Sequence, residues 1–216
     1  SDYYFLTTKL EEPQTSKLVE SLGGKMIRSL IEASRLSNKG AKILVLADRT
    51  RTTKKFLFSL SRGLAPLKPG WLQECRRLGE ITDAIPYTIP FGVPLFREPP
   101  LPPPCNWVSL LNRQGLLPVP REERVLHGLE IGLVSESQSF ADNVSVVIEE
   151  AGATVVKASK SSMAQNLYCV VCEKTVKRLP HKYPCEVVEF AWVVECVQTQ
   201  KRVPFAKKGY YDFTDF

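Results

Sequence analysis

One short segment of this sequence combines hydroxyl and cationic side chains where a helix is expected to start. Its members are Arg49, Thr50, Arg51, Thr52, Thr53, Lys54 and Lys55. The first turn of a helix leaves backbone N–H groups unpaired and carries a partial positive charge, so hydroxyls and cations placed there suit a phosphate group. The wider stretch from Arg35 to Arg77 holds eleven basic and two acidic residues, a net charge of +9. The segment is therefore a candidate phosphate cradle, and the alternative is a solvated basic face.

The cysteines and histidines offer less chemistry. Cys169 and Cys172 form a CxxC pair, but they lie in an apolar run typical of a strand, where residues three apart point to opposite faces. We therefore expect buried thiols in a reducing compartment, with a redox or zinc site as the alternative. His127 and His181 do not complete a zinc site, and no phosphate-binding glycine loop, GxSxG or HExxH motif occurs. No cofactor, metal or enzymatic activity is expected.

The composition indicates a globular chain with an anionic partner. The 216 residues, 44% hydrophobic and 24% charged, leave room for one large domain or two of about 100 residues each. A net charge of +6 favours phosphate, nucleic acid or acidic peptide as partner. No apolar run approaches the roughly 20 residues that a membrane helix needs, so no membrane association is expected.

The apolar pattern predicts the elements that position these side chains. In the first half we expect strands at Tyr3–Thr8 and Ile43–Ala47, a short strand from Leu67, and helices over Ser16–Leu22, about Thr52–Arg62 and from Trp71. The second half repeats this order, with strands at Leu129–Ser135, Ala153–Val156, Leu167–Cys172 and Val187–Val188, a helical stripe of Val144, Val147 and Ile148, and a helix from Trp192. The two W-x-x-E-C pentapeptides lie 121 residues apart. Two copies of a β-α-β-β-α-β-α unit are the interpretation.

Proline marks the region between the two copies. Ten of the 16 prolines lie between Pro86 and Pro120, which predicts an extended, semi-rigid connector because proline fixes φ and lacks the N–H. Within it, Trp107–Leu111 is apolar enough for a short helix that packs against its neighbours. The predicted organisation is a first unit over residues 1–85, a proline-rich linker over 86–125 and a second unit over 126–216.

Together these features resemble a tandem BRCT repeat of the DNA-damage checkpoint mediator type. The resemblance rests on the glycine turns at Gly23-Gly24 and Gly152, the apolar third strand, and Trp71 and Trp192 in the last helices. The run Asp48–Leu57, followed by Gly63, is especially similar to checkpoint mediators. The resemblance implies an α/β fold with two repeats, each a four-stranded parallel sheet flanked by helices, packed in tandem through the linker. It also implies a nuclear protein.

The resemblance further implies a phosphate site on the first repeat. It assigns the phosphate contacts to the Thr7 hydroxyl, the backbone N–H of Thr8, and Thr53 and Lys55, where counting back from Gly63 selects Lys55 rather than Lys54. The alternative for Thr7 is that it is only a good strand former. In the second repeat Glu136 follows Ser135 and would repel phosphate, so one site is expected.

In such families the groove between the repeats receives the ligand residue three after the phosphoserine. The matching positions are Leu57 on the first repeat and Phe140 and Val194 on the second, and core packing explains them equally well. Many relatives carry an arginine three residues before the lysine, where this chain has Thr52. Arg51 or Arg49 would then bind a ligand carboxylate, since a guanidinium suits one.

The leading hypothesis is therefore a phosphoserine-peptide reader in DNA-damage checkpoint signalling. Its expected ligand is a phosphorylated histone tail at DNA breaks, with an association with chromatin. One alternative is a phosphate-independent protein-interaction scaffold, and another is direct DNA binding through the basic first repeat. A salt titration distinguishes DNA binding, because contacts to many phosphates give a steep salt dependence. The oligomeric state is not predicted.

Overall fold

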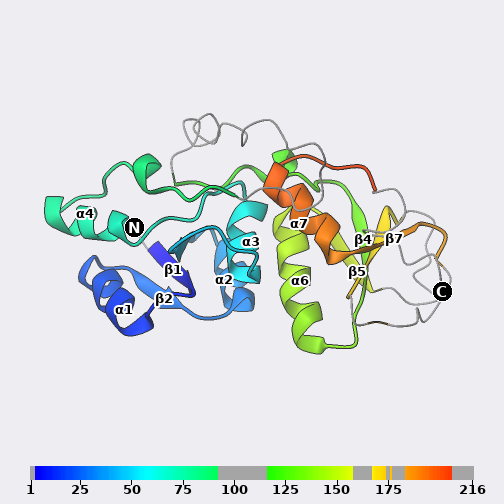
Figure 1. Cartoon of the computed structure of the whole chain (residues 1–216), viewed down its shortest axis with the longest axis horizontal. Coiled ribbons are helices and arrows are strands. Elements are labelled where there is room, and N and C mark those ends of the chain that lie inside the picture. Colours follow the sequence, from blue (N-terminus) through cyan, green and yellow to red (C-terminus); the bar gives the residue numbers. More distant parts are fainter. Residues whose placement is uncertain (1–2, 92–115, 158–166, 174–175, 177–182, 206–216) are drawn as a thin grey trace.

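Two α/β units lie side by side along the long axis of the molecule (Figure 1). The structure, a computed structural model, describes residues 3–91, 116–157, 167–173, 176 and 183–205. We call the unit from β1 to α4 the first repeat and the unit from β4 to α7 the second repeat. Each is built on its own parallel sheet, which agrees with the predicted fold class.

The first repeat has a parallel sheet with strand order β2-β1-β3. Its strands are β1 (Tyr3–Thr8), β2 (Lys25–Ile27) and β3 (Lys42–Ala47). Alternate residues of β1 serve the two faces of the sheet, because Phe5 packs in one buried cluster and Leu6 in another.

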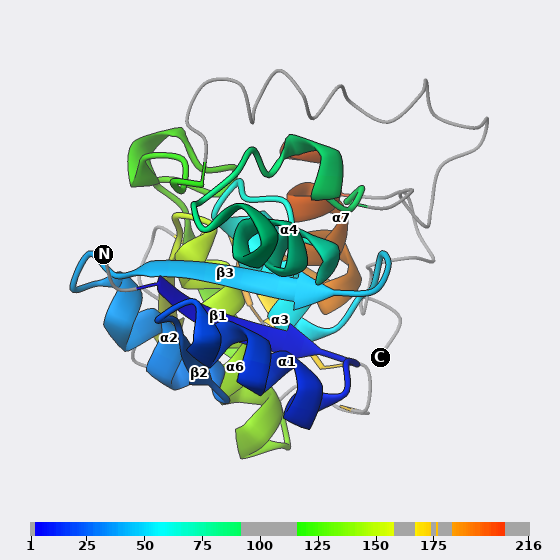
Figure 2. The same ribbon diagram turned by 90° about the vertical axis from the view of Figure 1, so that its left-hand side faces the viewer.

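Each face of this sheet is covered by two helices. Helices α1 (Glu12–Ser21) and α4 (Gly70–Leu78) cover the face of Phe5, and Figure 2 shows α4 beside β3 from this end of the molecule. Helices α2 (Leu30–Ser37) and α3 (Lys54–Ser61) cover the face of Leu6.

The predicted fourth strand of the first repeat is reduced to one residue. Leu67 forms isolated bridges with Leu46 and Thr88 and extends no further as a strand. Pro66 and Pro69 flank this bridge and lack the N–H that a longer ladder would need. The expectation of four strands in each repeat is therefore wrong for the first repeat.

The second repeat has the complete sheet, with strand order β5-β4-β6-β7 and all pairs parallel. The strands are β4 (Glu130–Val134), β5 (Thr154–Lys157), β6 (Cys169–Cys172) and β7 (Glu186–Glu189). Its helices are α6 (Gln138–Glu150) and α7 (Phe190–Thr199). These four strands and two helices agree with the sequence prediction, whereas the helix that the predicted unit places between its third and fourth strands falls on a stretch largely outside the described residues.

Four of the described helices form the junction between the repeats. Helix α3 of the first repeat packs against α6 and α7, and α2 also contacts α6. The largest buried cluster accordingly combines Leu57 and Leu60 of α3 with residues of the second repeat such as Val144 and Val197. Burial of apolar surface shared by both repeats holds them in one arrangement.

The described parts of the linker are bound to the repeats. The Thr50 hydroxyl donates to the carbonyl of Pro90 at 2.7 Å, and the N–H of Val119 donates to the carbonyl of Arg62 at 2.9 Å. Trp107–Leu111 lies outside the described residues. The unit boundaries 1–85, 86–125 and 126–216 stay a prediction. Among the described helices, none has the length and apolar character needed to cross a membrane.

Candidate functional site

The end of β1 meets the start of α3 through two threonine hydroxyls. Thr8 Oγ1 lies 2.7 Å from Thr53 Oγ1. Thr53 is the N-cap of α3, with an extended backbone, and its hydroxyl accepts a hydrogen bond from the N–H of Phe56 at 3.3 Å. Threonine favours this position because its side chain satisfies a backbone N–H that the helix leaves open. The contact brings two of the predicted site residues together at a helix N-terminus.

In the structure the strand hydroxyl that contacts Thr53 is that of Thr8 and not that of Thr7. Side chains alternate along a strand, so Thr7 belongs to the face of Phe5, whereas Thr8 shares the face of Leu6, which α3 covers. The sequence analysis assigned the phosphate contacts to the Thr7 hydroxyl and the Thr8 N–H, and that assignment stays a prediction. After Thr8 the chain turns at Lys9, whose φ of 56° is uncommon for a residue other than glycine.

The two lysines in the first turn of α3 have different surroundings. Lys54 Nζ lies 5.2 Å from the ring centroid of Phe140, so its ammonium forms a cation–π contact across the junction. Lys55 is half-buried and forms no hydrogen bond or ion pair with any residue in the described ranges. Of the two, Lys55 is thus the ammonium without a partner inside the described chain, and it stands in the helix turn that Thr53 caps.

The arginines expected to replace the missing family arginine are bound to a carboxylate of the chain itself. Arg51 Nη2 donates to both oxygens of Asp48 at 2.8 and 2.9 Å, and Arg51 lowers the pKa of the Asp48 carboxyl. Arg49 Nε lies 3.6 Å from the same carboxylate, with 73% of its side chain exposed. Thr52 is exposed. A ligand carboxylate would therefore compete with Asp48 for Arg51.

The predicted groove residues divide between core and surface. Leu57 is 0% exposed and Val194 is 8% exposed, and both belong to the buried cluster of the junction. Phe140 is half-buried, beside Lys54, with its ring edge-to-face against Phe190 at a centroid distance of 5.8 Å. Core packing accounts for Leu57 and Val194, and Phe140 is the one of the three whose ring contacts the ammonium of Lys54.

In the second repeat the corresponding strand end is occupied by a side chain of the protein. The Ser135 hydroxyl donates to Glu173 Oε2 at 2.5 Å, and the N–H of Ser137 donates to the same oxygen at 3.3 Å. The Glu173 carboxylate thus accepts hydrogen bonds from both the hydroxyl and the amide at this strand end. This arrangement adds to the charge of Glu136 as a reason for a single phosphate site.

The CxxC pair consists of two buried thiols that form no disulfide with each other. Cys169, Cys172 and Cys196 are free thiols, and all three are buried. Burial raises the pKa of Cys172 to about 11, which keeps the thiol protonated at neutral pH. Within the described ranges no three metal-binding side chains gather as a site. The prediction of buried thiols is confirmed for both CxxC residues.

Part of the basic segment is neutralised within the fold. Arg62 is 2% exposed and faces Glu150 across the junction, and Arg77 is paired with Glu74 at 2.7 Å. With Arg49 and Arg51 beside Asp48, several of the eleven cations have acidic neighbours. Asp48 and Glu74 are already counted in the net charge of +9, so among the described ion pairs only that of Arg62 with Glu150 lowers the charge that the segment offers DNA below that value.

Comparison with known proteins finds a family similarity for the second repeat. Residues 124–214 match the model of the BRCA1 C Terminus (BRCT) domain family. Over 173 residues, 80% of this chain, it is 26% identical to Mediator of DNA damage checkpoint protein 1 of Macaca mulatta. The human protein of the same name is 26% identical over 77% of this chain. The chain spans about 7% of the length of these relatives.

Solved structures of paired BRCT domains share the fold. The BRCT5-BRCT6 domains of S. pombe Brc1 superimpose with a TM-score of 0.59 at 18% identity, covering 92% of this chain and 93% of that one. Rtt107p, in its complex with a phosphorylated histone, gives a TM-score of 0.53 at 17% identity, covering 95% and 90%. The α/β architecture of both repeats is therefore that of a tandem BRCT pair.

Proposed function

We propose that the first repeat binds a phosphoserine peptide and that the chain serves in DNA-damage checkpoint signalling. The observation that carries the proposal is the contact between the Thr8 and Thr53 hydroxyls at the N-terminus of α3, with Lys55 in the same helical turn. Hydroxyl donors, open helix amides and an ammonium are the groups that an anion needs, and here they come from two separate stretches of the chain.

The chemistry of phosphoserine matches this set of groups. At neutral pH it carries about −1.5 to −2 charges and three acceptor oxygens. In the proposed complex the hydroxyls of Thr8 and Thr53 each donate to one phosphate oxygen, and Lys55 neutralises the charge. The N–H that follows the strand hydroxyl is that of Lys9, and the left-handed turn at this residue directs the chain away from the strand.

The proposed ligand is a phosphorylated histone tail at DNA breaks, read in the nucleus on chromatin. Support comes from the 26% identity to Mediator of DNA damage checkpoint protein 1 and from Rtt107p, which was solved with a phosphorylated histone. Because Thr52 replaces the family arginine and Arg51 is bound to Asp48, we propose that the free carboxy terminus of the peptide contributes little to the affinity.

Calorimetry with a serine-phosphorylated peptide tests the proposal. The peptide is taken from the carboxy-terminal tail of the histone that was solved with Rtt107p, and we call it the phosphorylated histone peptide. We expect binding that requires the phosphate and that differs little between peptides with free and amidated carboxy termini. Lys55→Met should weaken binding at least about tenfold, since it removes a charge-assisted contact. Lys39→Met, at an exposed lysine of the same repeat, is the control and should bind as the unmodified chain does.

Two outcomes would contradict the proposal. Equal affinity for the phosphorylated histone peptide and its unphosphorylated twin would favour a phosphate-independent scaffold. Equal affinity of the Lys55→Met variant and the unmodified chain would remove Lys55 from the site. A titration with salt adds a further check, because one phosphate gives a shallow salt dependence and duplex DNA a steep one.

A further inference from the structure

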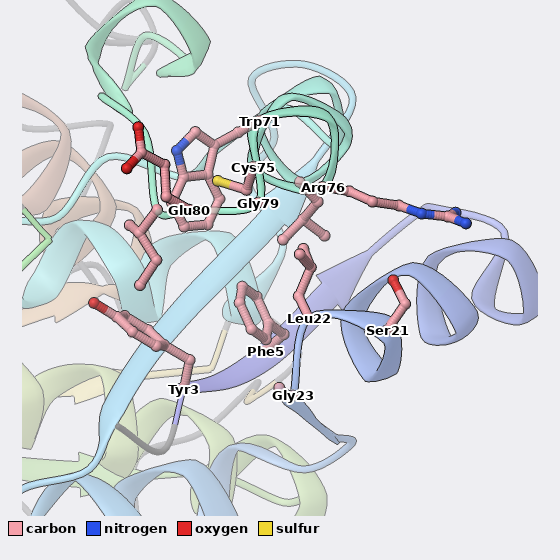
Figure 3. A pocket seen from close by; sticks show the side chains of 13 residues that line it. Tyr3, Phe5, Ser21, Leu22, Gly23, Trp71, Cys75, Arg76, Gly79 and Glu80 are labelled. Atoms are coloured by element: carbon pink, nitrogen blue, oxygen red, sulfur yellow. The ribbon is translucent and has the colours of Figure 1, made fainter.

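The first repeat contains a cavity on the sheet face that points away from the second repeat. It has a volume of about 350 Å³ and lies between α1, α4 and β1. Figure 3 shows the rings of Tyr3 and Phe5 on β1 and the indole of Trp71 on α4 directed toward the same space, with Leu22 at its side. Helices α2 and α3, which contact the second repeat, cover the other face of the sheet. The cavity is thus separate from the proposed phosphate site.

The second repeat has an aromatic contact on its equivalent tryptophan that the first repeat lacks. Trp71 and Trp192 are equivalent, because each indole Nε1 donates to the carbonyl eleven residues later, at 3.1 and 3.0 Å. Two residues beyond that carbonyl the second repeat has Phe205, whose ring packs on Trp192 at a centroid distance of 5.2 Å. The first repeat has Ala84 at this position. An aromatic ring that completes the core in one copy is therefore missing from the other.

The rim of the cavity is apolar on one side and charged at two points. Ile81 is 54% exposed and lines the cavity, and Leu78, at the end of α4, is 44% exposed. Exposed aliphatic side chains next to an aromatic-walled cavity are typical of an interaction site. Arg76 lines the opening, extends away from α4, and has no ion pair or hydrogen bond within the described ranges. Glu80 lies on the rim as well.

We propose that this cavity binds a partner peptide by one bulky apolar side chain that is adjacent to an acidic residue. The volume suits a single leucine or phenylalanine side chain with part of its backbone. Arg76 supplies the charge complementarity, because a guanidinium binds a carboxylate with two parallel hydrogen bonds. Glu80 accepts a backbone N–H of the same peptide. The binding requires no phosphate, so the chain has two independent peptide sites.

Nuclear magnetic resonance with defined peptides tests this proposal. The probes are the blocked peptides acetyl-Gly-Asp-Phe-Gly-amide and acetyl-Gly-Phe-Asp-Gly-amide, each with twins in which asparagine replaces aspartate or alanine replaces phenylalanine. The reporter is the indole N–H resonance of Trp71, with that of Trp192 as the internal control in the same chain. We expect that the Trp71 resonance alone shifts as peptide is added and that the shift saturates. The dissociation constant should lie in the millimolar range that a small ligand reaches.

Three variants separate the cavity from other causes of a shift. Ser21→Trp places a ring over the opening, so peptide binding should be lost. The fold should be retained, because Ser21 is exposed and its hydroxyl donates only within α1. Arg76→Ala should weaken binding of the aspartate peptides about fivefold to tenfold and leave the asparagine twins unchanged. Arg77→Ala is the matched control, since Arg77 is exposed in the same helical turn but lies outside the cavity.

The proposal is overturned if Trp71 does not respond to any probe, or if its response persists in Ser21→Trp. It is also overturned if Arg76→Ala and Arg77→Ala have the same effect. Sedimentation that shows a dimer of the chain, lost in Ser21→Trp, would identify a second copy as the occupant in place of a partner peptide. Affinity for the phosphorylated histone peptide should stay unchanged in all three variants, so failure here does not affect the proposed phosphate site.

Discussion

At the scale of single residues, the candidate site depends on which threonine of β1 faces α3. Thr8 is 4% exposed and lies against Thr53, whereas Thr7 is 5% exposed on the other face of the strand. Both residues are almost fully buried, so burial does not distinguish them. The difference lies in direction alone, because a shift of one residue along a strand reverses the face.

Substitution of each threonine by valine, which has the same shape without the hydroxyl, tests this assignment. Thr8→Val should weaken binding of the phosphorylated histone peptide about fivefold to tenfold, because one hydrogen bond to a charged group is lost. Thr7→Val should leave the affinity within about twofold. Calorimetry on both variants decides between them. The opposite ranking would return the phosphate contact to Thr7, as the sequence alone suggested.

The sequence predicted part of the geometry of the candidate site, and the reason differs from residue to residue. Thr53 and Lys55 are fixed by their distance from Gly63, since a helix of known length transmits that spacing. The register at Thr7 and Thr8 could not be fixed in this way. Two consecutive threonines have the same local preference, and the left-handed turn after them falls on Lys9, where no glycine marks it. The binding of Arg51 to Asp48 likewise depends on side-chain geometry that spacing does not reveal.

At the scale of elements, the sequence predicted the sheet cores well and the short elements poorly. Helix α2 was missed, although Ser29 caps it by accepting from the N–H of Glu32, a Ser-x-x-Glu pattern that is visible in the sequence. Helix α1 begins at Glu12, earlier than the predicted Ser16, because Pro13 suits the first turn. Apolar periodicity detects long buried segments, but it does not detect short helices whose main sequence signal is a capping residue.

The C-terminus of helix α3 is enclosed by the second half of the chain, and this enclosure can be tested. Gly63 follows the helix with a φ of 67°, and a Cβ there would lie 2.3 Å from Val119 Cγ2. Gly63→Ala should therefore lower the free energy of unfolding by roughly 2–4 kcal/mol, from the left-handed backbone and the overlap together. Urea denaturation measures this change.

Gly40→Ala is the control for that experiment. Gly40 has a φ of 80°, and no atom lies within 4 Å of a Cβ added there, so only the backbone term of about 1–2 kcal/mol should appear. The difference between the two variants isolates the contact of α3 with Val119. Equal losses of unfolding free energy in the two variants would mean that Val119 moves aside without an energetic cost.

At the scale of the whole molecule, a buried charge network crosses the junction between the repeats. Arg62 follows α3, and its Nε lies 3.7 Å from Glu150 Oε2 of α6, which also accepts from Arg124 at 3.0 Å. Arg62 additionally donates to the carbonyl of Ile43 at 3.2 Å. Burial lowers the pKa of Arg62, which means that its charge is costly in the folded state. One carboxylate therefore compensates two arginines from different parts of the chain.

Removal of that carboxylate should weaken the junction more than any surface change nearby. Glu150→Ala leaves Arg62 buried without a counter-charge and should lower the free energy of unfolding by about 3–5 kcal/mol. Glu149→Ala, at the half-buried neighbour on the same helix, should cost less than about 1 kcal/mol.

The indole resonances of Trp71 and Trp192 report one repeat each during urea denaturation. They should disappear together in the unmodified chain, because the core cluster of α3, α6 and α7 is shared. In Glu150→Ala we expect two separate midpoints, and a common midpoint with unchanged stability would show that apolar packing alone joins the repeats.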